Sequence, residues 1–398
     1  MTDVLEAPEP HLDTVRRDRE VDTAESMKIA MERSGVPYAR QSRDLLALRR
    51  GPGGIEPKEY YYYALYDRSL YDDAARAAFL GRWRVHRMVS ALAEDVYGRT
   101  TDKVTTQNLL ADAGIAVPTT LAVYGRSEDV SKDAAWIHDI DGLRRIFRAM
   151  TPAGLFGKPV HSVGSLGVIS IDGFDAAGDT VLACDGRAIA LSEFATELRR
   201  YEERGYQFQE RLRPHPEIEP VIGNRIGTLR VLVVNTEEQT TIIRTSWKIP
   251  TGDNMADNFW RPGNLLAAVE PDTGRVFRVV DDVHPRLREV SAHPDTGAPL
   301  VGFVLPDWQA MRDTVIRASR EMRGLPLLGW DIALTDRGPM AVEVEGNGGH
   351  PMMTQLPQGR GLLEEPAVRE LMAGIRRTQP GLPALIGRWV LQRLRAAG

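Results

Sequence analysis

The spacing of hydrophobic positions divides this chain into a helical region followed by two regions of mixed structure. Over residues 23–50 the apolar positions recur at helical spacing, with an interruption at Gly35 and Pro37. Shorter segments of helical pattern follow at residues 60–64, 74–80 and 84–92. We therefore expect residues 21–100 to form a mainly helical N-terminal region. Residues 1–20, rich in Pro, Asp, Glu and Arg, are expected to form a disordered tail.

The second region, residues 101–212, alternates helical segments with short runs that favour strands. The expected helices are residues 103–113, 141–150 and 191–203, and the expected strands are 119–124, 155–160, 168–171, 180–184 and 206–211. Gly- or Asp-containing turns separate several of these segments. Alternation of this kind is typical of an α/β lobe.

The third region, residues 213–372, is richer in strands and predicts a second lobe. Strands are expected at residues 228–234, 240–249, 265–269, 276–280, 327–334 and 340–344, and helices at 307–322 and 362–372. A last helical pattern, at 385–394, places a C-terminal helix within residues 373–398. The predicted fold class is therefore α+β (α/β), with two lobes preceded by the helical region.

Composition narrows the classes of function. The 398 residues carry a formal net charge of -5 and a pI near 6.0, which leaves no basic field to hold a nucleic-acid backbone. No run approaches the roughly 20 apolar residues that a membrane helix needs. Residues 1–20 do not have the pattern of a signal peptide, and the single cysteine, Cys184, fits a reducing compartment. We expect a cytoplasmic protein without nucleic-acid or membrane partners.

An acidic cluster closes the last predicted hairpin. Asp331 lies near the start of one strand, while Glu343, Glu345 and Asn347 follow at alternate positions at the end of its partner. Oxygen side chains brought this close repel one another unless cations lie between them. Carboxylate and amide oxygens, completed by water and phosphate, suit Mg²⁺. We predict a magnesium site from Asp331, Glu345 and Asn347, with Glu343 either a third ligand or a solvent-facing neighbour.

Two cationic residues lie in apolar strands, where an unpaired charge would be poorly solvated. Lys158 lies in the predicted strand 155–160 and precedes a loop rich in Gly and Ser. Arg230 lies in the predicted strand 228–234. A lysine and the backbone N–H groups of a glycine-rich loop can surround phosphates. Both positions therefore indicate an anionic ligand.

These positions belong to a longer set of motifs. In chain order the set is Lys103, Lys158 with its Gly/Ser loop, Gln209-Glu210-Arg211-Leu212, Arg230, Asp331 and Glu345-Gly346-Asn347. The set resembles the ATP-grasp superfamily over about residues 100–370. The run Gly329-Trp330-Asp331-Ile332-Ala333-Leu334-Thr335 is similar to the glutamate-ligase-like, sugar-transfer-associated branch. The resemblance implies an ATP-grasp fold of two lobes that clasp ATP.

For the nucleotide, the resemblance implies ATP and Mg²⁺ as cofactors. Lys103 and Lys158 would neutralise the phosphates. The lid over them would contain Ser162, Gly164 and Ser165.

The resemblance also implies an adenine and ribose site. Gln209, Glu210 and Leu212 would belong to the interlobe hinge, whose backbone meets the adenine edge, and Glu217 would hold the ribose hydroxyls. A blander interpretation of Glu217 as a surface residue has equal weight.

For catalysis, the resemblance implies that Arg230, together with Lys158, would stabilise the charge on the transferred phosphoryl group. Arg244 and Lys248 share a strand face and are candidates for the substrate pocket, although packing explains them equally well. Most ATP-grasp ligases begin with a Rossmann-like domain that helps to bind substrate. The helical region predicted here departs from that layout, so the resemblance does not identify the substrate.

The function implied is an ADP-forming carboxylate–amine ligase that forms an amide through an acyl phosphate. Its partners would be a small-molecule carboxylate and an amine or other nucleophile, and a homodimer is one expectation for its assembly. The first alternative is an ATP-grasp kinase, which would leave the phosphoryl group on its product, or another ATP-grasp enzyme in which a different nucleophile closes the bond. A nucleotide-binding regulatory module without turnover is the second.

Overall fold

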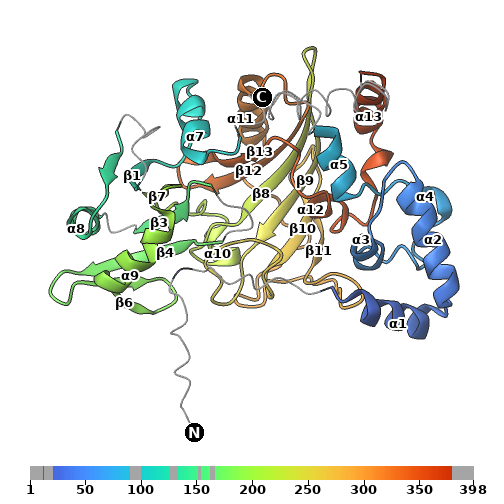
Figure 1. Cartoon of the computed structure of the whole chain (residues 1–398), viewed down its shortest axis with the longest axis horizontal. Coiled ribbons are helices and arrows are strands. Elements are labelled where there is room, and N and C mark those ends of the chain that lie inside the picture. Colours follow the sequence, from blue (N-terminus) through green and yellow to red (C-terminus); the bar gives the residue numbers. More distant parts are fainter. Residues whose placement is uncertain are drawn as a thin grey trace, which may run out of the picture.

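The computed structural model describes residue 12 and residues 21–89, 100–125, 133–150, 154–161 and 166–378. The predicted N-terminal tail lies outside this part of the chain except for Leu12, whose side chain is buried in the core of the first lobe. The predicted helix at 385–394 also lies outside the described residues. Figure 1 shows the second lobe, which follows residue 212, in the middle, with the first lobe on one side and the helical region on the other.

The N-terminal region is helical, as its hydrophobic spacing predicts. Asp22 caps the first helix by accepting hydrogen bonds from the N–H groups of Ala24 and Glu25, and Gly35 ends it with a positive φ of 63°. The helices of this region are α1 (Thr23–Ser34), α2 (Tyr38–Arg50), α3 (Pro57–Tyr62), α4 (Asp73–Ala77) and α5 (Arg82–Val89).

The first lobe contains a seven-stranded sheet in the order β2-β1-β7-β3-β4-β5-β6. Its helices are buried against the sheet through residues such as Phe147 and Phe194. The strands are β1 (Thr120–Tyr124), β2 (Ala135–Ile137), β3 (Leu155–Pro159), β4 (Ile169–Asp175), β5 (Thr180–Ala183), β6 (Ala188–Ala190) and β7 (Tyr206–Glu210), and the helices are α7 (Lys103–Asp112), α8 (Ile140–Arg148), α9 (Leu191–Leu198) and η1 (Arg199–Tyr201). Strands β2 and β6 were not predicted, because three residues are too few to show an alternating pattern.

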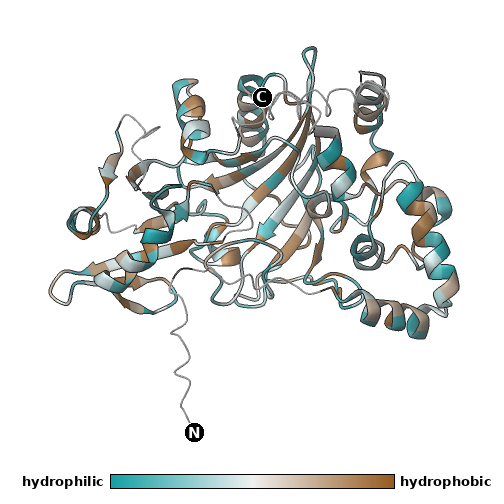
Figure 2. Cartoon of the chain, in the orientation of Figure 1, coloured by the Kyte–Doolittle hydropathy of each residue, from teal (hydrophilic) through white to brown (hydrophobic). Residues whose placement is uncertain are grey.

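The second lobe contains a six-stranded sheet in the order β11-β10-β9-β8-β12-β13. Helix α11 packs on one face through Met311, Val315 and Ala318. The strands are β8 (Thr228–Asn235), β9 (Thr240–Ile249), β10 (Leu265–Val269), β11 (Val276–Val280), β12 (Leu327–Thr335) and β13 (Gly338–Glu345), and the helices are α10 (Glu219–Ile222), α11 (Trp308–Glu321), α12 (Met352–Gln355), η2 (Leu362–Glu364) and α13 (Pro366–Thr378). Hydrophobic residues follow the central strands of this sheet in Figure 2.

The helical region packs on the face of the second lobe's sheet opposite to helix α11. Tyr60 to Tyr63 are buried there in one core with Leu266 and Val280. Gln355 fixes the contact, since its amide donates to the Tyr63 hydroxyl at 2.8 Å and its side-chain oxygen accepts from the Leu80 N–H at 2.8 Å. The region therefore forms one body with the second lobe, in place of a Rossmann-like domain.

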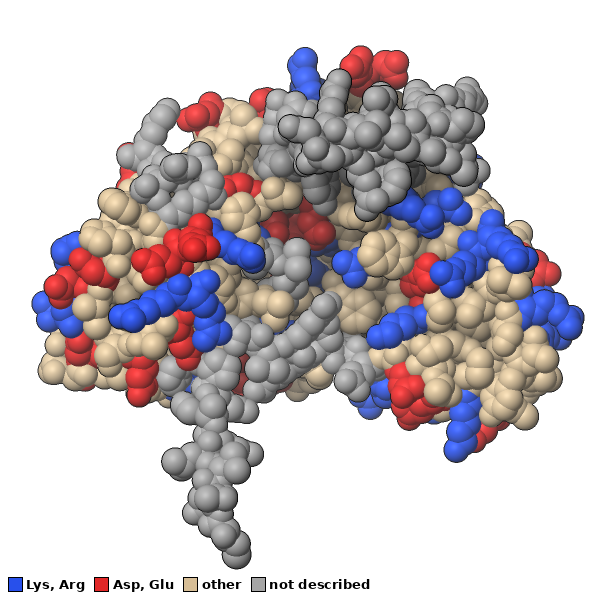
Figure 3. Space-filling view, viewed as in Figure 1, with Lys and Arg blue, Asp and Glu red and all other residues tan. Residues whose placement is uncertain are grey.

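The visible surface mixes both signs of charge. Figure 3 shows Lys and Arg side chains interspersed with Asp and Glu over both lobes and the helical region. None of the described helices is long and apolar enough to pass through a lipid bilayer.

Candidate active site

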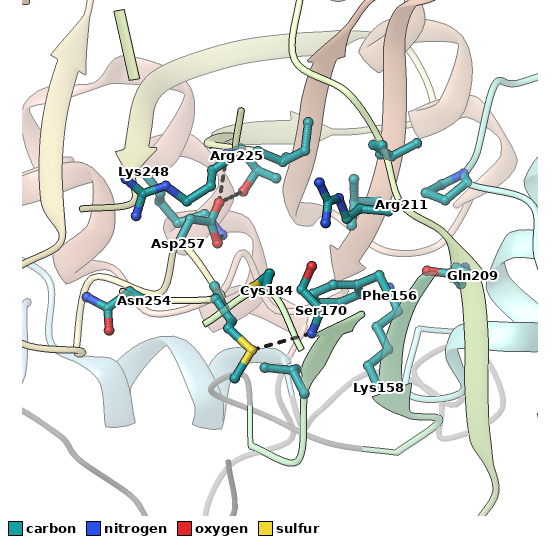
Figure 4. A pocket seen from close by; sticks show the side chains of 18 of the residues that line it. Phe156, Lys158, Ser170, Cys184, Gln209, Arg211, Arg225, Lys248, Asn254 and Asp257 are labelled. Carbon is teal, nitrogen blue, oxygen red and sulfur yellow. Dashed lines mark hydrogen bonds and ion pairs between the residues drawn. The ribbon is translucent and has the colours of Figure 1, made fainter. Parts of the chain in front are cut away.

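A cavity of about 480 Å³ is lined by residues of both lobes. Figure 4 shows Lys158 and Gln209 on one side and Lys248 and Asp257 on the other. The first lobe contributes strands β3, β4 and β7, and the second contributes β8, β9, β12 and β13 with the loop that follows β9. The lining residues predicted from sequence are Lys103, Lys158, Gln209, Glu210, Leu212 and Asp331.

Lys158 is a buried cation that faces the cavity. Strand β3 places it between the apolar side chains of the first lobe, with 5% of its surface exposed. Burial lowers the pKa of Lys158 to about 8; the nearby charge of Lys103 acts in the same direction, while Glu343 and Asp331 oppose it. The Lys158 ammonium forms no hydrogen bond or ion pair within the described residues. An anion in the cavity would supply the missing counter-charge.

Lys103 stands at the start of helix α7, close to the acidic hairpin. Asp102 caps this helix by accepting from the Thr105 N–H at 2.9 Å, which fixes the first turn. The Lys103 Nζ lies 3.4 Å from the Glu343 carboxylate. Glu343 is therefore only partly exposed, and it lines the cavity beside Lys103.

A row of alternating charges crosses the second sheet. Strands β8 and β12 pair Arg230 directly with Asp331. The Arg230 Nε donates to Asp331 Oδ1 at 2.8 Å, and another guanidinium nitrogen lies 2.6 Å from Glu345. On the other side, the Lys248 Nζ donates to Asp331 Oδ2 at 3.0 Å and lies 3.5 Å from Asp257. The predicted repulsion between the acids is therefore relieved by side-chain cations.

The pKa values of this row reflect its pairing. Burial by itself would raise the pKa of Asp331, but the charges of Arg230 and Lys248 hold it at about 2. Burial would likewise lower the pKa of Lys248, yet Asp257 and Asp331 raise it. The pKa of Arg230 is raised because its two carboxylate partners outweigh burial. All three groups are ionised at neutral pH.

The hairpin end offers hard oxygen ligands to Mg²⁺, but few of them. In the described part of the chain, no three His, Cys, Asp or Glu side chains converge as a metal site. Asp331 and Glu345 contribute carboxylates, and the side-chain oxygen of Asn347 accepts from the Gly349 N–H at 2.9 Å. Carboxylate and amide oxygens retain lone pairs for a metal. The donor set fits Mg²⁺ if phosphate and water oxygens complete the octahedron.

The predicted hinge borders the cavity through strand β7 and the residues after it. The Gln209 side chain is buried and donates to Gln107 at 2.7 Å, so its amide is occupied within the first lobe. The Glu210 carboxylate accepts from the Thr119 N–H at 2.9 Å and lies 2.8 Å from Arg337 of the second lobe. These side chains fix the hinge, and the backbone is left to meet a ligand.

Some predicted residues are not brought to the cavity. Glu217 is exposed and does not line it. Arg230, Glu345 and Asn347 are not among the lining residues, although Arg230 contacts both Asp331 and Glu345. Ser162, Gly164 and Ser165 lie outside the described residues.

The structure adds Asp257 to the site and separates two residues that the sequence grouped together. Lys248 lines the cavity, whereas Arg244, on the same strand face, donates to Glu365 at 2.8 Å and to the Gly361 carbonyl at 2.8 Å. Arg244 is therefore a packing residue. Asp257 carried no pattern in the sequence, because it lies in a loop whose course depends on distant contacts.

Comparison with known proteins identifies the family. Residues 93–370 match the family described as sugar-transfer associated ATP-grasp. The chain belongs to this family. Its fold is mixed α/β, with two sheets and a helical N-terminal region. A search of curated proteins found no match.

Several solved structures are similar at low identity. D-alanyl-alanine synthetase A from Vibrio cholerae O1 biovar eltor is 12% identical with a TM-score of 0.41, and the alignment covers 71% of this chain and 67% of that one. D-alanine–D-alanine ligase from Bacillus anthracis is 14% identical with a TM-score of 0.39, covering 75% and 77%. N5-carboxyaminoimidazole synthase from Aspergillus clavatus, solved with ADP and 5-aminoimidazole ribonucleotide, is 12% identical with a TM-score of 0.37, covering 72% of this chain and only 59% of that one. The family assignment rests on the sequence match.

Proposed function

We propose that this ATP-grasp enzyme is an ADP-forming ligase that joins a small carboxylate to an amine. The proposal is carried by the arrangement of buried cations around one cavity, with Lys103, Lys158 and Lys248 in its lining and Arg230 paired with the lining residue Asp331. Such a set can neutralise a triphosphate, whose charge would otherwise be excluded from a buried site.

Each cation has a separate task in this proposal. The Lys158 ammonium has no hydrogen-bond or ion-pair partner among the described residues, so it is free to bind phosphate oxygens. Arg230 is held rigidly by Asp331 and Glu345, and it would stabilise the charge that develops on the transferred phosphoryl group. Bound Mg²⁺, held by Asp331, Glu345 and Asn347, would neutralise phosphate charge. The residues act by positioning and electrostatics.

The chemistry of a ligase requires two transfers. A substrate carboxylate oxygen attacks the γ-phosphorus of ATP, the bond to the β-phosphate oxygen breaks, and ADP leaves with that electron pair. The acyl phosphate so formed has a good leaving group. An amine then attacks the acyl carbon, phosphate departs, and the amine loses a proton to give the amide. A kinase would stop after the first transfer and release no free phosphate.

Calorimetry with Mg-ATP tests the binding step. Wild type should bind, and both Lys158→Ala and Asp331→Asn should lose most of that affinity while remaining folded by circular dichroism. Failure of the folded wild type to bind Mg-ATP would refute the proposal.

Product analysis tests the chemistry. With a panel of acids and amines, ADP and free phosphate should appear in equal amounts and only when both substrates are present. Formation of ADP with a phosphorylated product, without free phosphate, would establish the kinase instead.

A further inference from the structure

Asp257 is a largely buried carboxylate in the cavity wall, and it has no role in the proposed ligase chemistry. Its Oδ2 accepts two hydrogen bonds from Thr228, from the backbone N–H at 2.7 Å and from the hydroxyl at 2.5 Å. Its Oδ1 lies 3.5 Å from the Lys248 Nζ. The side chain is only 12% exposed, so its charge is balanced mainly by these neighbours.

The loop that carries Asp257 is held in a fixed shape. Asn264 lies at its centre, with a side-chain amide that donates to the carbonyls of Ala256 at 2.8 Å and Asn258 at 2.9 Å. These two residues flank Asp257 in the sequence. The Asn264 side-chain oxygen also accepts from the Thr251 N–H at 3.1 Å, where the loop leaves strand β9. The position of Asp257 is therefore set by the fold, independently of the hairpin that carries Asp331.

Lys248 consequently stands between two carboxylates of different kinds. One, Asp331, belongs to the proposed magnesium site and binds the Lys248 ammonium at 3.0 Å. The other, Asp257, lies outside that site. A divalent cation on Asp331 would repel the ammonium and compete for the same oxygens. Lys248 would then lose its shorter contact at the moment when phosphates enter the cavity.

We propose that Asp257 is a positioning residue that retains the Lys248 ammonium at the cavity wall when Asp331 coordinates Mg²⁺. The carboxylate gives Lys248 a second anchor, from which the ammonium can reach the phosphates of Mg-ATP. Without Asp257, the buried ammonium would have no carboxylate outside the magnesium site within contact distance among the described residues. This inference rests on the proposed function, and it predicts that Asp257 acts on nucleotide binding through Lys248.

A double-mutant cycle measured by calorimetry tests the proposal. Mg-ATP binding is compared for wild type, Asp257→Asn, Lys248→Met and the double variant. The substitution Asp257→Asn should raise the Kd for Mg-ATP roughly tenfold, within the range of coupling between contacting residues. In the Lys248→Met background the same substitution should change the Kd less than about twofold. Equal losses in both backgrounds, or no loss in wild type, would overturn the proposal.

Removing the metal provides a second readout. With ATP and a chelator, Asp331 keeps its contact with Lys248, so Asp257→Asn should weaken binding much less than it does with Mg-ATP. A loss that is the same with and without Mg²⁺ would count against the proposed role. The matched control is Asp253→Asn, which removes one negative charge from the same loop, and its effect should be smaller than that of Asp257→Asn.

Two further checks separate the possible failures. If Asp257→Asn does not fold, Thr228→Val keeps the Asp257 charge but removes one hydrogen bond, and it should raise the Kd for Mg-ATP by a larger factor in wild type than in Lys248→Met. A folded wild type that does not bind Mg-ATP would remove the proposed function and this inference together. Wild-type binding with additive effects in the cycle would remove this inference alone.

Discussion

Lys158 and Arg230 are both buried cations on central strands, yet their surroundings differ. Arg230 has two carboxylate partners within 2.8 Å, and its charge is stabilised by the protein. The Lys158 ammonium has neither an ion pair nor a hydrogen bond among the described residues, and burial lowers the pKa of Lys158 to about 8. The second lobe has thus neutralised its own charges, whereas the first lobe presents a charge that a ligand can neutralise.

This difference predicts opposite effects on stability. A cation that the fold has paired contributes to the native state, and its removal leaves buried carboxylates without a partner. A buried cation without a partner destabilises the protein when the cavity is empty. Binding of an anion supplies the missing counter-charge and removes this cost. Stability and binding should therefore respond in the same direction at Arg230 and in opposite directions at Lys158.

The largest effect is expected for Arg230→Met. Asp331 and Glu345 would lose their shared partner, and the free energy of unfolding should fall by about 3 to 5 kcal/mol. Urea unfolding followed by circular dichroism measures this change. Arg230→Lys keeps the positive charge, so its free energy of unfolding should fall by less than that of Arg230→Met. A loss below about 1 kcal/mol for Arg230→Met would mean that the row of charges contributes little to the fold.

The opposite sign is expected for Lys158→Met. At pH 7 the variant should be more stable than wild type by roughly 1 to 3 kcal/mol, since the buried charge is replaced by an apolar side chain of similar length and one pKa unit corresponds to about 1.4 kcal/mol. The same variant should bind Mg-ATP far more weakly in calorimetry. A variant that is destabilised and also fails to bind would show that Lys158 is structural.

The pH dependence of this gain sharpens the comparison. The folded-state pKa of Lys158, about 8, lies below its unfolded value of about 10.4, so below pH 8 both states are charged and the full cost is present. Between pH 8 and about 10.4 the unfolded state binds more protons, and wild-type stability rises with pH as far as this group is concerned. The stability advantage of Lys158→Met should therefore shrink over that interval. An advantage that stays constant in parallel urea titrations would contradict the lowered pKa.

The smallest effect is expected for Glu217→Ala. This residue is exposed and outside the cavity lining, so the Kd for Mg-ATP should change less than about twofold. Calorimetry measures the Kd for Mg-ATP of Glu217→Ala, and the much larger change expected for Lys158→Met serves as the comparison. A tenfold loss would restore the ribose role predicted for Glu217 and would require the segment after the hinge to move when nucleotide binds.

The sequence by itself determined the element types and much of the site. Helical spacing predicted α1 and α2, and alternation predicted the hairpin of β12 and β13, because these patterns depend on neighbours a few residues apart. Motif order predicted that Lys103, Lys158 and Asp331 belong to one site, and all three line the same cavity. The three-residue strands β2 and β6 could not be predicted from such local patterns, because their pairing depends on the rest of the sheet.

The tertiary structure alone decided how the charges are paired. Arg230 and Asp331 are 101 residues apart, and Lys248 and Asp331 are 83 apart, so only the register of three strands brings them into contact. It also separated Lys248, which lines the cavity, from Arg244, which is enclosed by the segment around Gly361. Asp257 depends on the loop centred on Asn264. Local patterns specify elements, but the partner of a buried charge is set by long-range packing, because burial and pairing are properties of the folded chain.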